Sequence, residues 1–291
     1  MKIISRKYYG RAYNMLNDLD KENIIEAFFK QENIGRHFDE IALDLDVSSR
    51  AFSRVLKEAN INTRVKGRYE VLNQDYFEVI DTERKAYFLG LIYADGYVGI
   101  HDELVISFKD NEDGIRILNI LKEEVGFTGE LKTQIQNGGY KPKATCAKLN
   151  FSNAKINSEL RKLGLSEYKL KSRKHIPDIP KELIPHFIRG LFDGDGSITV
   201  YYDSSSGKPC EKATFAVYGN DSLLQEIRDI FINELGCNYT SIRTTGNSDK
   251  IPEYRVGGKK QLQKVKHYLY DNATIYFQYK RDKFYSFSPV R

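Results

Sequence analysis

Apolar positions recur at helical spacing over the first part of the chain. Isoleucine, leucine, phenylalanine and valine return every three or four positions in KENIIEAFFKQEN and in FDEIALDLDVSSRAFSRVLKEAN, which is the period of an amphipathic helix. A polar and basic stretch without such a period follows, NTRVKGRYEVLNQDYFE. The pattern predicts a helical domain over residues 1–66 and a linker over residues 67–81.

The rest of the chain repeats one pattern twice. Each copy begins with an apolar segment ending in Asp-Gly, AYFLGLIYADGYV in the first and HFIRGLFDGDGSI in the second. Two strand-like segments, an amphipathic helix, two more strand-like segments around a glycine turn and a last helix then follow. This order predicts an α+β protein with two pseudo-symmetric αββαββα halves, residues 82–180 and 181–291, after a small all-α domain.

Alternation along the strands separates two faces of each predicted sheet. In ELKTQIQ, Leu131, Thr133 and Ile135 are expected to pack on the helices, which leaves a polar and basic face on the other side. A two-stranded ribbon fits the major groove of DNA, where basic and amide side chains read base edges. The alternative is an ordinary solvated sheet face. The candidate DNA-contacting residues of the two sheets are Lys132, Gln134, Gln136, Lys148, Ser241, Arg243 and Arg255.

Composition and charge agree with a globular protein that has a polyanionic partner. The chain has 291 residues, of which 41% are hydrophobic and 29% charged, and its formal net charge is +5. This charge permits a nucleic-acid ligand without establishing one. Basic residues crowd together at 130–181 and again at 243–291, as two equivalent DNA-facing surfaces would require.

Cysteine usage and hydropathy exclude several classes of protein. The three cysteines, Cys146, Cys210 and Cys237, form no Cys-x-x-Cys pair, which argues against a zinc site and a disulfide framework. No signal peptide and no run of about 18 apolar residues is present. We expect an intracellular protein, whether cytoplasmic, organellar or phage-encoded, with no membrane partner.

The two Asp-Gly segments resemble paired helices that approach closely. Small residues on one helix face allow two backbones to pack together. They recur here at four-residue spacing, as Gly90 and Ala94 in the first copy and Gly190 and Gly194 in the second. Gly96 and Gly196 are expected to adopt the left-handed conformation that ends many helices.

Asp95 and Asp195 would then lie at two adjacent helix C-termini. Each helix end carries a partial negative charge, and two carboxylates beside it repel each other. A divalent cation such as Mg²⁺ resolves the conflict, and it binds a few carboxylates together with water and phosphate oxygens. Two acids at a symmetric junction suit metal-assisted hydrolysis of a phosphodiester. The alternative is that each Asp-Gly only caps its helix.

FLGLIYADG (88–96) and IRGLFDGDG (188–196) resemble the signature motifs of the LAGLIDADG homing endonucleases, over roughly residues 75–291. The resemblance implies a single-chain, monomeric, Mg²⁺-dependent enzyme that cuts both strands of a long asymmetric site in double-stranded DNA. It makes Asp95 and Asp195 the metal ligands. Tyr93 replaces the usual first aspartate of the motif, which Asp193 keeps. Leu89 and Arg189 replace a small residue at a position expected to face away from the helix pair.

The resemblance also suggests two further pairs of site residues. Asp110 and Asn220, each before the middle helix of its copy, match a polar position near the metal and its waters. Lys169 and Lys280, after each third helix, match a lysine near the scissile phosphate that polarises water or stabilises developing charge. Lys171 competes with Lys169 for this place, and a solvated surface role is the alternative for each lysine.

The segment FDEIALDLDVSSRAFSRVLKEANI resembles a helix-turn-helix. Ser48 or Ser49 is expected to cap the second helix, with Val47, Phe52 and Val55 packing inward. A generic helical pair is the alternative. The outward residues suited to bases and phosphates are Ser49, Arg50, Ser53, Arg54 and Lys57. The basic residues expected to follow the minor groove or the backbone are Arg64, Lys66 and Arg68.

Two other functions are compatible with the same fold. One is a regulator that binds DNA without cleaving it, which the retention of both Asp95 and Asp195 disfavours. The other is an RNA maturase that assists intron splicing, an activity that can coexist with cleavage. No obligate protein partner is expected.

Overall fold

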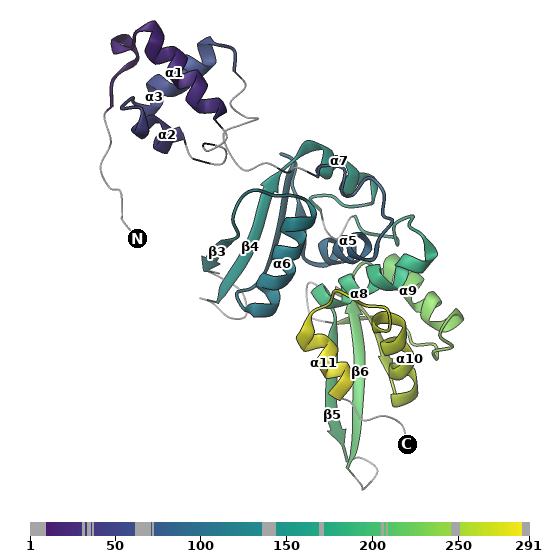
Figure 1. The fold of residues 1–291 in the computed structure, drawn as a ribbon. Helices are drawn as coiled ribbons and strands as arrows, with labels where there is room; N and C mark the ends of the chain where they lie inside the picture. The colour runs from purple at the N-terminus through teal and green to yellow at the C-terminus, as the bar shows by residue number, and fades with distance from the viewer. Residues whose placement is uncertain are drawn as a thin grey trace. The chain divides into compact units, whose positions relative to one another are not determined.

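The protein is described by a computed structural model, shown in Figure 1, which divides into two compact units. The first unit is 1–72 with 126–130, and the second is 73–125 with 131–291. No helix in the described part of the chain is long and apolar enough to cross a membrane. The described residues are 10–30, 33, 36, 38–61, 71, 73–135, 144–168, 172–204, 207, 209–245 and 251–286.

The regular secondary structure described in the first unit consists of helices, with two isolated β-bridges. Asn17 and Asp20 form a capping box that begins the first long helix. A short turn joins the next two helices, and Asp46 adopts a positive φ of 53° in it. The helices are η1 (Tyr13–Met15), α1 (Asp18–Phe29), α2 (Phe38–Asp44) and α3 (Ser49–Glu58).

Capping and packing of α3 follow the pattern of its sequence. Ser48, rather than Ser49, caps the helix, since its side chain accepts from the backbone N–H of Ala51. Val47, Phe52 and Val55 are buried in the core of the unit, as predicted. The structure therefore leaves the opposite side of α3 exposed.

The second unit contains the two predicted halves, each with the order αββαββα. The first half consists of α5 (Glu83–Asp95), β1 (Tyr97–Val98), β2 (Glu103–Lys109), α6 (Glu112–Glu124), β3 (Lys132–Ile135), β4 (Thr145–Ser152) and α7 (Ala154–Lys162). The second half begins after η3 (Lys181–Leu183) and adds a last helix, and it consists of α8 (Ile184–Asp195), β5 (Ser197–Asp203), β6 (Cys210–Tyr218), α9 (Asp221–Asn233), β7 (Arg243–Thr245), β8 (Ile251–Gly257), α10 (Lys259–Tyr270) and α11 (Gln278–Ser286).

Both sheets are antiparallel and have the same topology. Their strand orders are β1-β2-β4-β3 and β5-β6-β8-β7, so the repeat seen in the sequence is also a repeat of the fold. The hairpins at their starts differ in length. The β5–β6 register runs from Ser197↔Ala216 to Asp203↔Cys210, whereas β1 and β2 share two pairs. In Figure 1 β5 and β6 extend well past α10.

The two halves join through α5 and α8, whose backbones touch. A Cβ atom added to Gly90 would overlap the carbonyl oxygen of Phe187, and one added to Gly190 would overlap that of Tyr87. One added to Gly194 would overlap the side chain of Ala94. The small residues at four-residue spacing therefore serve the close approach that their pattern predicts.

Helices cover one face of each sheet, but not along every strand. In β2 and β4 every second side chain is buried. Thr133 and Ile135 are exposed, so the prediction that they pack on the helices is wrong. The reason is that β3 is the edge strand of its sheet, beyond the cover that the central strands receive.

Candidate functional site

Asp95 and Asp195 are the last residues of α5 and α8. The glycine after each is extended, with φ of −79° at Gly96 and −88° at Gly196, so the prediction of a left-handed conformation is wrong. Glycine suits both positions for a reason other than a left-handed conformation. A Cβ atom at either position would overlap the preceding helical turn, at Ile92 or at Phe192.

The two acids come together where the helices end. A Cβ atom placed on Gly194 would lie 2.8 Å from Oδ2 of Asp95, so this carboxylate lies against the residue before Asp195. Both carboxylates are also close enough to act electrostatically on the same two buried cations, Arg173 and Lys280. The structure thus brings the predicted pair into one site.

Lys280 is buried beside this pair rather than exposed. Its ammonium donates to the carbonyl oxygens of Phe192 and Asp193, both at 2.6 Å, of Gly196 at 2.8 Å and of Gly194 at 3.2 Å. Burial lowers the pKa of Lys280 to about 8, although nearby carboxylates oppose the shift. The lysine therefore holds the C-terminal turn of α8.

Arg173 does for α5 what Lys280 does for α8. Its Nη1 donates to the carbonyl oxygen of Tyr93, and its Nη2 donates to that of Gly96 at 2.7 Å. The side chain is 4% exposed, as is that of Lys280, and burial lowers the pKa of Arg173 to about 10. Arg173 is not among the site residues that the sequence pattern predicts.

Arg173 therefore competes with Lys169 as the residue of the first half that corresponds to Lys280. Lys169 and Lys171 lie outside the described residues. Arg173 lies eleven residues beyond the end of α7, and Lys280 lies ten beyond the end of α10. This distance from the third helix is the signal that could have identified Arg173.

The motif residues Asp193 and Tyr93 fasten the segments that carry these cations. Asp193 accepts from the backbone N–H of Phe277 at 2.8 Å and from the hydroxyl of Tyr87 at 2.9 Å. Tyr93 donates from its hydroxyl to the carbonyl oxygen of Leu163. Burial raises the pKa of Asp193 to about 6, against the opposing effect of Lys280.

Arg189 is not turned away from the helix pair. Its side chain is fully buried, and Nη2 donates to Oε1 of Glu83 on α5 at 2.6 Å. Its other nitrogens donate to the carbonyl oxygens of Leu269 and Ile275. The prediction for position 189 is wrong, because the arginine joins α8 to α5 and to the segment after α10.

The predicted equivalence of Asp110 and Asn220 is also wrong. Asn220 is the N-cap of α9, where it accepts from the N–H of Ser222 at 3.0 Å. The N-cap of α6 is Asn111, which accepts from the N–H of Gly114 at 2.9 Å. Asp110 precedes this cap by one residue, so the two asparagines are the matched pair.

The predicted polar residues of the first sheet share one face. Lys132 pairs with Lys148 and Gln134 pairs with Cys146, two residues along the same strands. Successive side chains alternate between faces, so Lys132, Gln134 and Lys148 point the same way. Gln136 lies outside the described residues.

The second sheet has a comparable face with one buried acid. Arg255 and Glu253 alternate onto the same side of β8, and Arg243 pairs with Glu253 across the ladder. Nε of Arg255 lies 2.7 Å from Oε2 of Glu253, whose side chain is fully buried. Ser241 is exposed and precedes β7.

Four of the five predicted recognition residues on α3 are exposed. Arg50, Ser53, Arg54 and Lys57 are exposed on α3, and Ser49 is half-buried. The exposed guanidinium of Arg54 is already engaged, because Nε lies 2.9 Å from Glu58 and the group stacks over a tyrosine ring. Three further candidates, Arg64, Lys66 and Arg68, lie outside the described residues.

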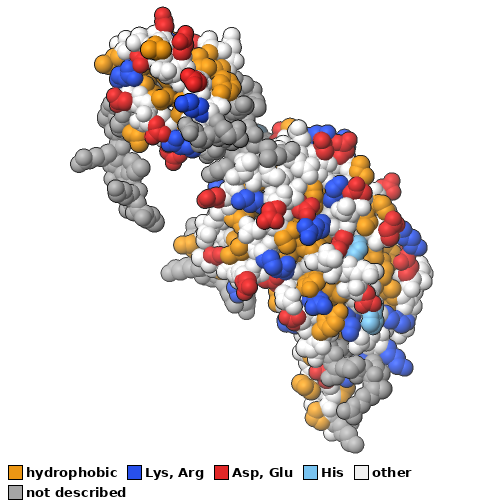
Figure 2. Space-filling view, viewed as in Figure 1, with side chains coloured by type: hydrophobic (Ala, Val, Ile, Leu, Met, Phe, Trp, Pro, Cys, Tyr) orange, Lys and Arg blue, Asp and Glu red, His pale blue; other side chains and the backbone are white. Residues whose placement is uncertain are grey.

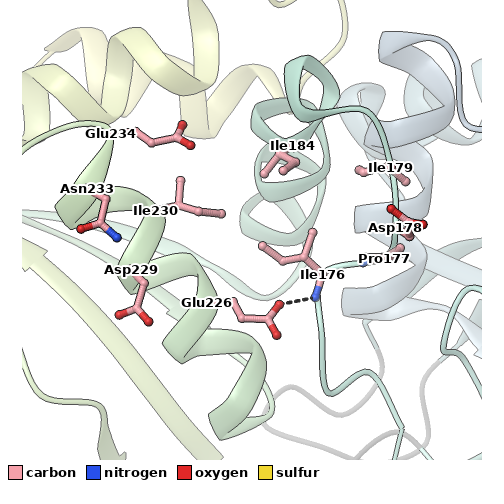
Figure 3. Close-up of a pocket in the computed structure, with 10 residues that line it drawn as sticks. All are labelled: Ile176, Pro177, Asp178, Ile179, Ile184, Glu226, Asp229, Ile230, Asn233 and Glu234. Atoms are coloured by element: carbon pink, nitrogen blue, oxygen red, sulfur yellow. Dashed lines mark hydrogen bonds between the residues drawn. The ribbon is translucent and has the colours of Figure 1, made fainter.

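A pocket of about 560 Å³ lies where the segment between the halves meets α9 (Figure 3). Oε2 of Glu226 accepts from the N–H of Ile176 at 2.8 Å and holds this segment in place. None of the candidate site residues lines it. On the face shown in Figure 2, acidic and basic side chains are interspersed rather than separated.

In the comparison with known proteins, one family model matches part of the chain. The sequence model described as LAGLIDADG endonuclease matches residues 188–288, which begin with the second Asp-Gly motif. The match covers 101 of the 291 residues. The two Asp-Gly motif segments lie in α5 and α8, and the match includes the second of them. No curated protein sequence matches the chain.

Three solved structures with LAGLIDADG folds are similar to this one. The meganuclease I-AabMI bound to uncleaved DNA is 16% identical, with 69% of this chain and 88% of that chain covered and a TM-score of 0.45. I-SmaMI bound to uncleaveable DNA is 13% identical, with 71% and 88% covered and a TM-score of 0.45. The N-terminal LAGLIDADG domain of DUF199/WhiA is 12% identical, with 72% and 93% covered and a TM-score of 0.41.

Proposed function

We propose that this protein is a monomeric homing endonuclease that makes double-strand breaks in a long, asymmetric DNA site. The observation that carries the proposal is the junction of Asp95 and Asp195 at the ends of two touching motif helices. A DNA-binding protein without nuclease activity would have no need for two acids at a place where helix ends disfavour negative charge. The family match supports the same conclusion.

Asp95 and Asp195 would hold a divalent cation such as Mg²⁺. Over the described residues there is no cluster of three or more His, Cys, Asp or Glu side chains that would form an all-protein metal site. Two carboxylates suit a cation that completes its coordination with water and DNA phosphate oxygens. When bound, the cation would neutralise the acids and stabilise charge on the scissile phosphate.

The two polar sheet faces would each bind one half of the site. Lys132, Gln134 and Lys148 lie on one face, and Arg243 and Arg255 lie on the other. Amide and guanidinium groups can read base edges in the major groove, whereas lysines hold phosphates. Buried Glu253 would keep Arg255 in place before DNA arrives.

The helical first unit would add a further DNA contact. Arg50, Ser53 and Lys57 are exposed on α3, the helix that a helix-turn-helix places in the major groove. Ser49 and Arg54 would contribute less, because one is half-buried and the other is paired with Glu58.

The remaining candidate residues have roles that the same proposal assigns. Lys169 would contact the scissile phosphate and stabilise its developing charge. Asp110 and Asn220 would contact the water around the cation, and Asn111 joins them as the structural counterpart of Asn220.

Selection from a randomised DNA library would identify the site, and cleavage of that site would test the function. We expect a plasmid carrying the site to be linearised with Mg²⁺ and to stay intact in EDTA. D95N and D195N should abolish cutting while binding in EDTA changes little. Tight binding without cleavage by the wild type in Mg²⁺ would instead indicate a regulator.

A further inference from the structure

We infer that Arg173 and Lys280 are a matched pair of positioning residues, each of which fixes the acid at the end of one motif helix. The inference rests on the proposed function only for what the acids bind. The contacts that carry it join each cation to backbone atoms on both sides of Asp95 or Asp195.

The last turn of a helix has four carbonyl groups without a partner in the helix. Arg173 takes the carbonyl oxygens of Tyr93 and Gly96, which lie on either side of Asp95 in the sequence. Lys280 takes those of Asp193 and Gly196 on either side of Asp195, together with two others. Each aspartate is thereby held at both flanks.

Charge explains why cations occupy these places. A neutral donor would satisfy the carbonyl oxygens, but it would not offset the negative charge of two helix ends and two carboxylates. Both cations are 4% exposed, so water screens their interactions only weakly. The positive charges of Arg173 and Lys280 therefore stabilise the pair of carboxylates before any metal binds.

The cations are themselves held by the motif helices. The segment before Arg173 is tied down by the hydroxyl of Tyr93, and that before Lys280 by the carboxylate of Asp193. The two copies reach the same result with different side chains. In each copy, the motif residue at this position, Tyr93 or Asp193, therefore holds the segment that carries the cation. The cation in turn holds the acid that lies two residues further along the motif.

The test compares R173M and K280M, which remove the charge and keep much of the side-chain stem, with the conservative variants R173K and K280R. Matched controls are R161M and K264M. Arg161 donates to the carbonyl oxygen of Gly99 and Lys264 to that of Gly236, so each also holds a carbonyl group, and both groups lie outside the motif helices α5 and α8.

The first readout is binding of Tb³⁺ alone, followed by tyrosine-sensitised luminescence, since the chain has 20 tyrosines and no tryptophan. Loss of a cation beside two acids would tighten Tb³⁺ binding if charge alone mattered. Loss of positioning should instead weaken it, about tenfold for R173M and K280M, with substantial recovery in R173K and K280R. Tighter or unchanged binding would overturn the inference.

The second readout needs no metal. Amide hydrogen exchange at Gly96 and Gly196 reports on the bonds that close the two helices, to Ile92 and Phe192 at 2.9 and 2.8 Å. R173M should speed exchange at Gly96 alone and K280M at Gly196 alone, by about tenfold, with no effect of either control. Equal effects at both glycines would contradict the pairing of one cation with one helix.

The two readouts also separate this inference from the proposed function. If D95N and D195N leave Tb³⁺ binding unchanged, the metal assignment fails. The selective exchange pattern would then still establish the helix-end role of the two cations, and its absence would refute that role whatever the acids bind.

Discussion

Arg189 of α8 and Glu83 of α5 form an ion pair of 2.6 Å across the two motif helices, with the arginine fully buried. The same glutamate accepts from the backbone N–H of Thr274 at 2.7 Å. One carboxylate therefore ties the first half to the second motif helix and to the segment before α11. A buried pair of this kind fixes a geometry rather than adding much net stability.

Removing one partner should be costly. E83Q leaves the guanidinium buried without its counter-charge, and we expect the free energy of unfolding to fall by about 3–5 kcal/mol. Urea unfolding followed by circular dichroism measures the change.

The matched control is the exposed pair of Arg84 and Glu124, also at 2.6 Å. E124Q should cost about 1 kcal/mol or less, because water screens an exposed pair. Similar losses for both variants would show that burial of Arg189 is not what makes its pair important.

The close approach of α5 and α8 gives a second prediction. In G190A the new methyl group overlaps the carbonyl oxygen of Tyr87, so the helices must separate. We expect a loss of more than about 3 kcal/mol, at or beyond the upper end for overpacked cores, measured as a fall in the thermal unfolding midpoint.

Gly257 provides the comparison for this helix contact. It lies in β8, and a Cβ atom there meets nothing within 4 Å. G257A should therefore leave the midpoint nearly unchanged. If G190A is as well tolerated as G257A, the helix backbones are not in contact.

The fold and the acid pair could be predicted because local pattern encodes both. Strand and helix periods alternate in the same order twice, and an Asp-Gly ends the first helix of each copy. These signals depend on near neighbours in the chain. Asp95 and Asp195, and their placement at the ends of two adjacent helices, could therefore be predicted from the sequence.

The contacts of the two buried cations could not be predicted from local pattern, although the family resemblance indicated Lys280 as a site residue. Arg173 and Lys280 bind backbone carbonyl groups more than 75 residues away. Every residue has such a group, so the residue types in the sequence do not indicate which ones a distant cation binds. The stretch KLKSRK offers four basic side chains, among which pattern alone does not choose. Arg189 was misjudged for a related reason, since arginine is seldom fully buried.

The predictions for the glycine conformations and for the edge strand were wrong for different reasons. A left-handed glycine at a helix end suits a chain that turns away, but here a strand begins directly after Gly96 and Gly196, so the backbone is extended. The alternation of ELKTQIQ says which side chains share a face. It does not say whether a helix covers that face at the edge of the sheet.

The buried acid Asp193 gives a third prediction, on pH. Its pKa is raised from 3.8 to about 6 by burial. Between these values the folded protein keeps a proton that the unfolded chain has released, so stability falls as the pH rises through this window. The wild type should lose about 2–3 kcal/mol relative to D193N between pH 4 and pH 7.

Urea unfolding of the wild type and D193N across this range tests the shift. The asparagine cannot ionise, so the difference between the two proteins isolates one group. A difference that stays constant with pH would mean that Asp193 titrates alike in both states. A difference of the opposite sign would mean that the ionised form is the one stabilised by the fold.

The last prediction asks whether the two sheets divide the DNA site. Gln134 is exposed on the polar face of the first sheet, and Arg243 is exposed on that of the second. If each side chain reads a base edge, Q134A and R243A should relax base preference in opposite half-sites, each by about 1–3 kcal/mol for a bidentate contact. K132A, beside Gln134 on the same face, should weaken binding to every sequence alike and reduce its salt dependence, as expected for a phosphate contact. Binding of every single-base variant of the selected site, measured in EDTA, separates these effects from cleavage. Specificity changes from Q134A and R243A at the same base pairs would contradict the division, because the two side chains belong to different sheets and should not share a half-site.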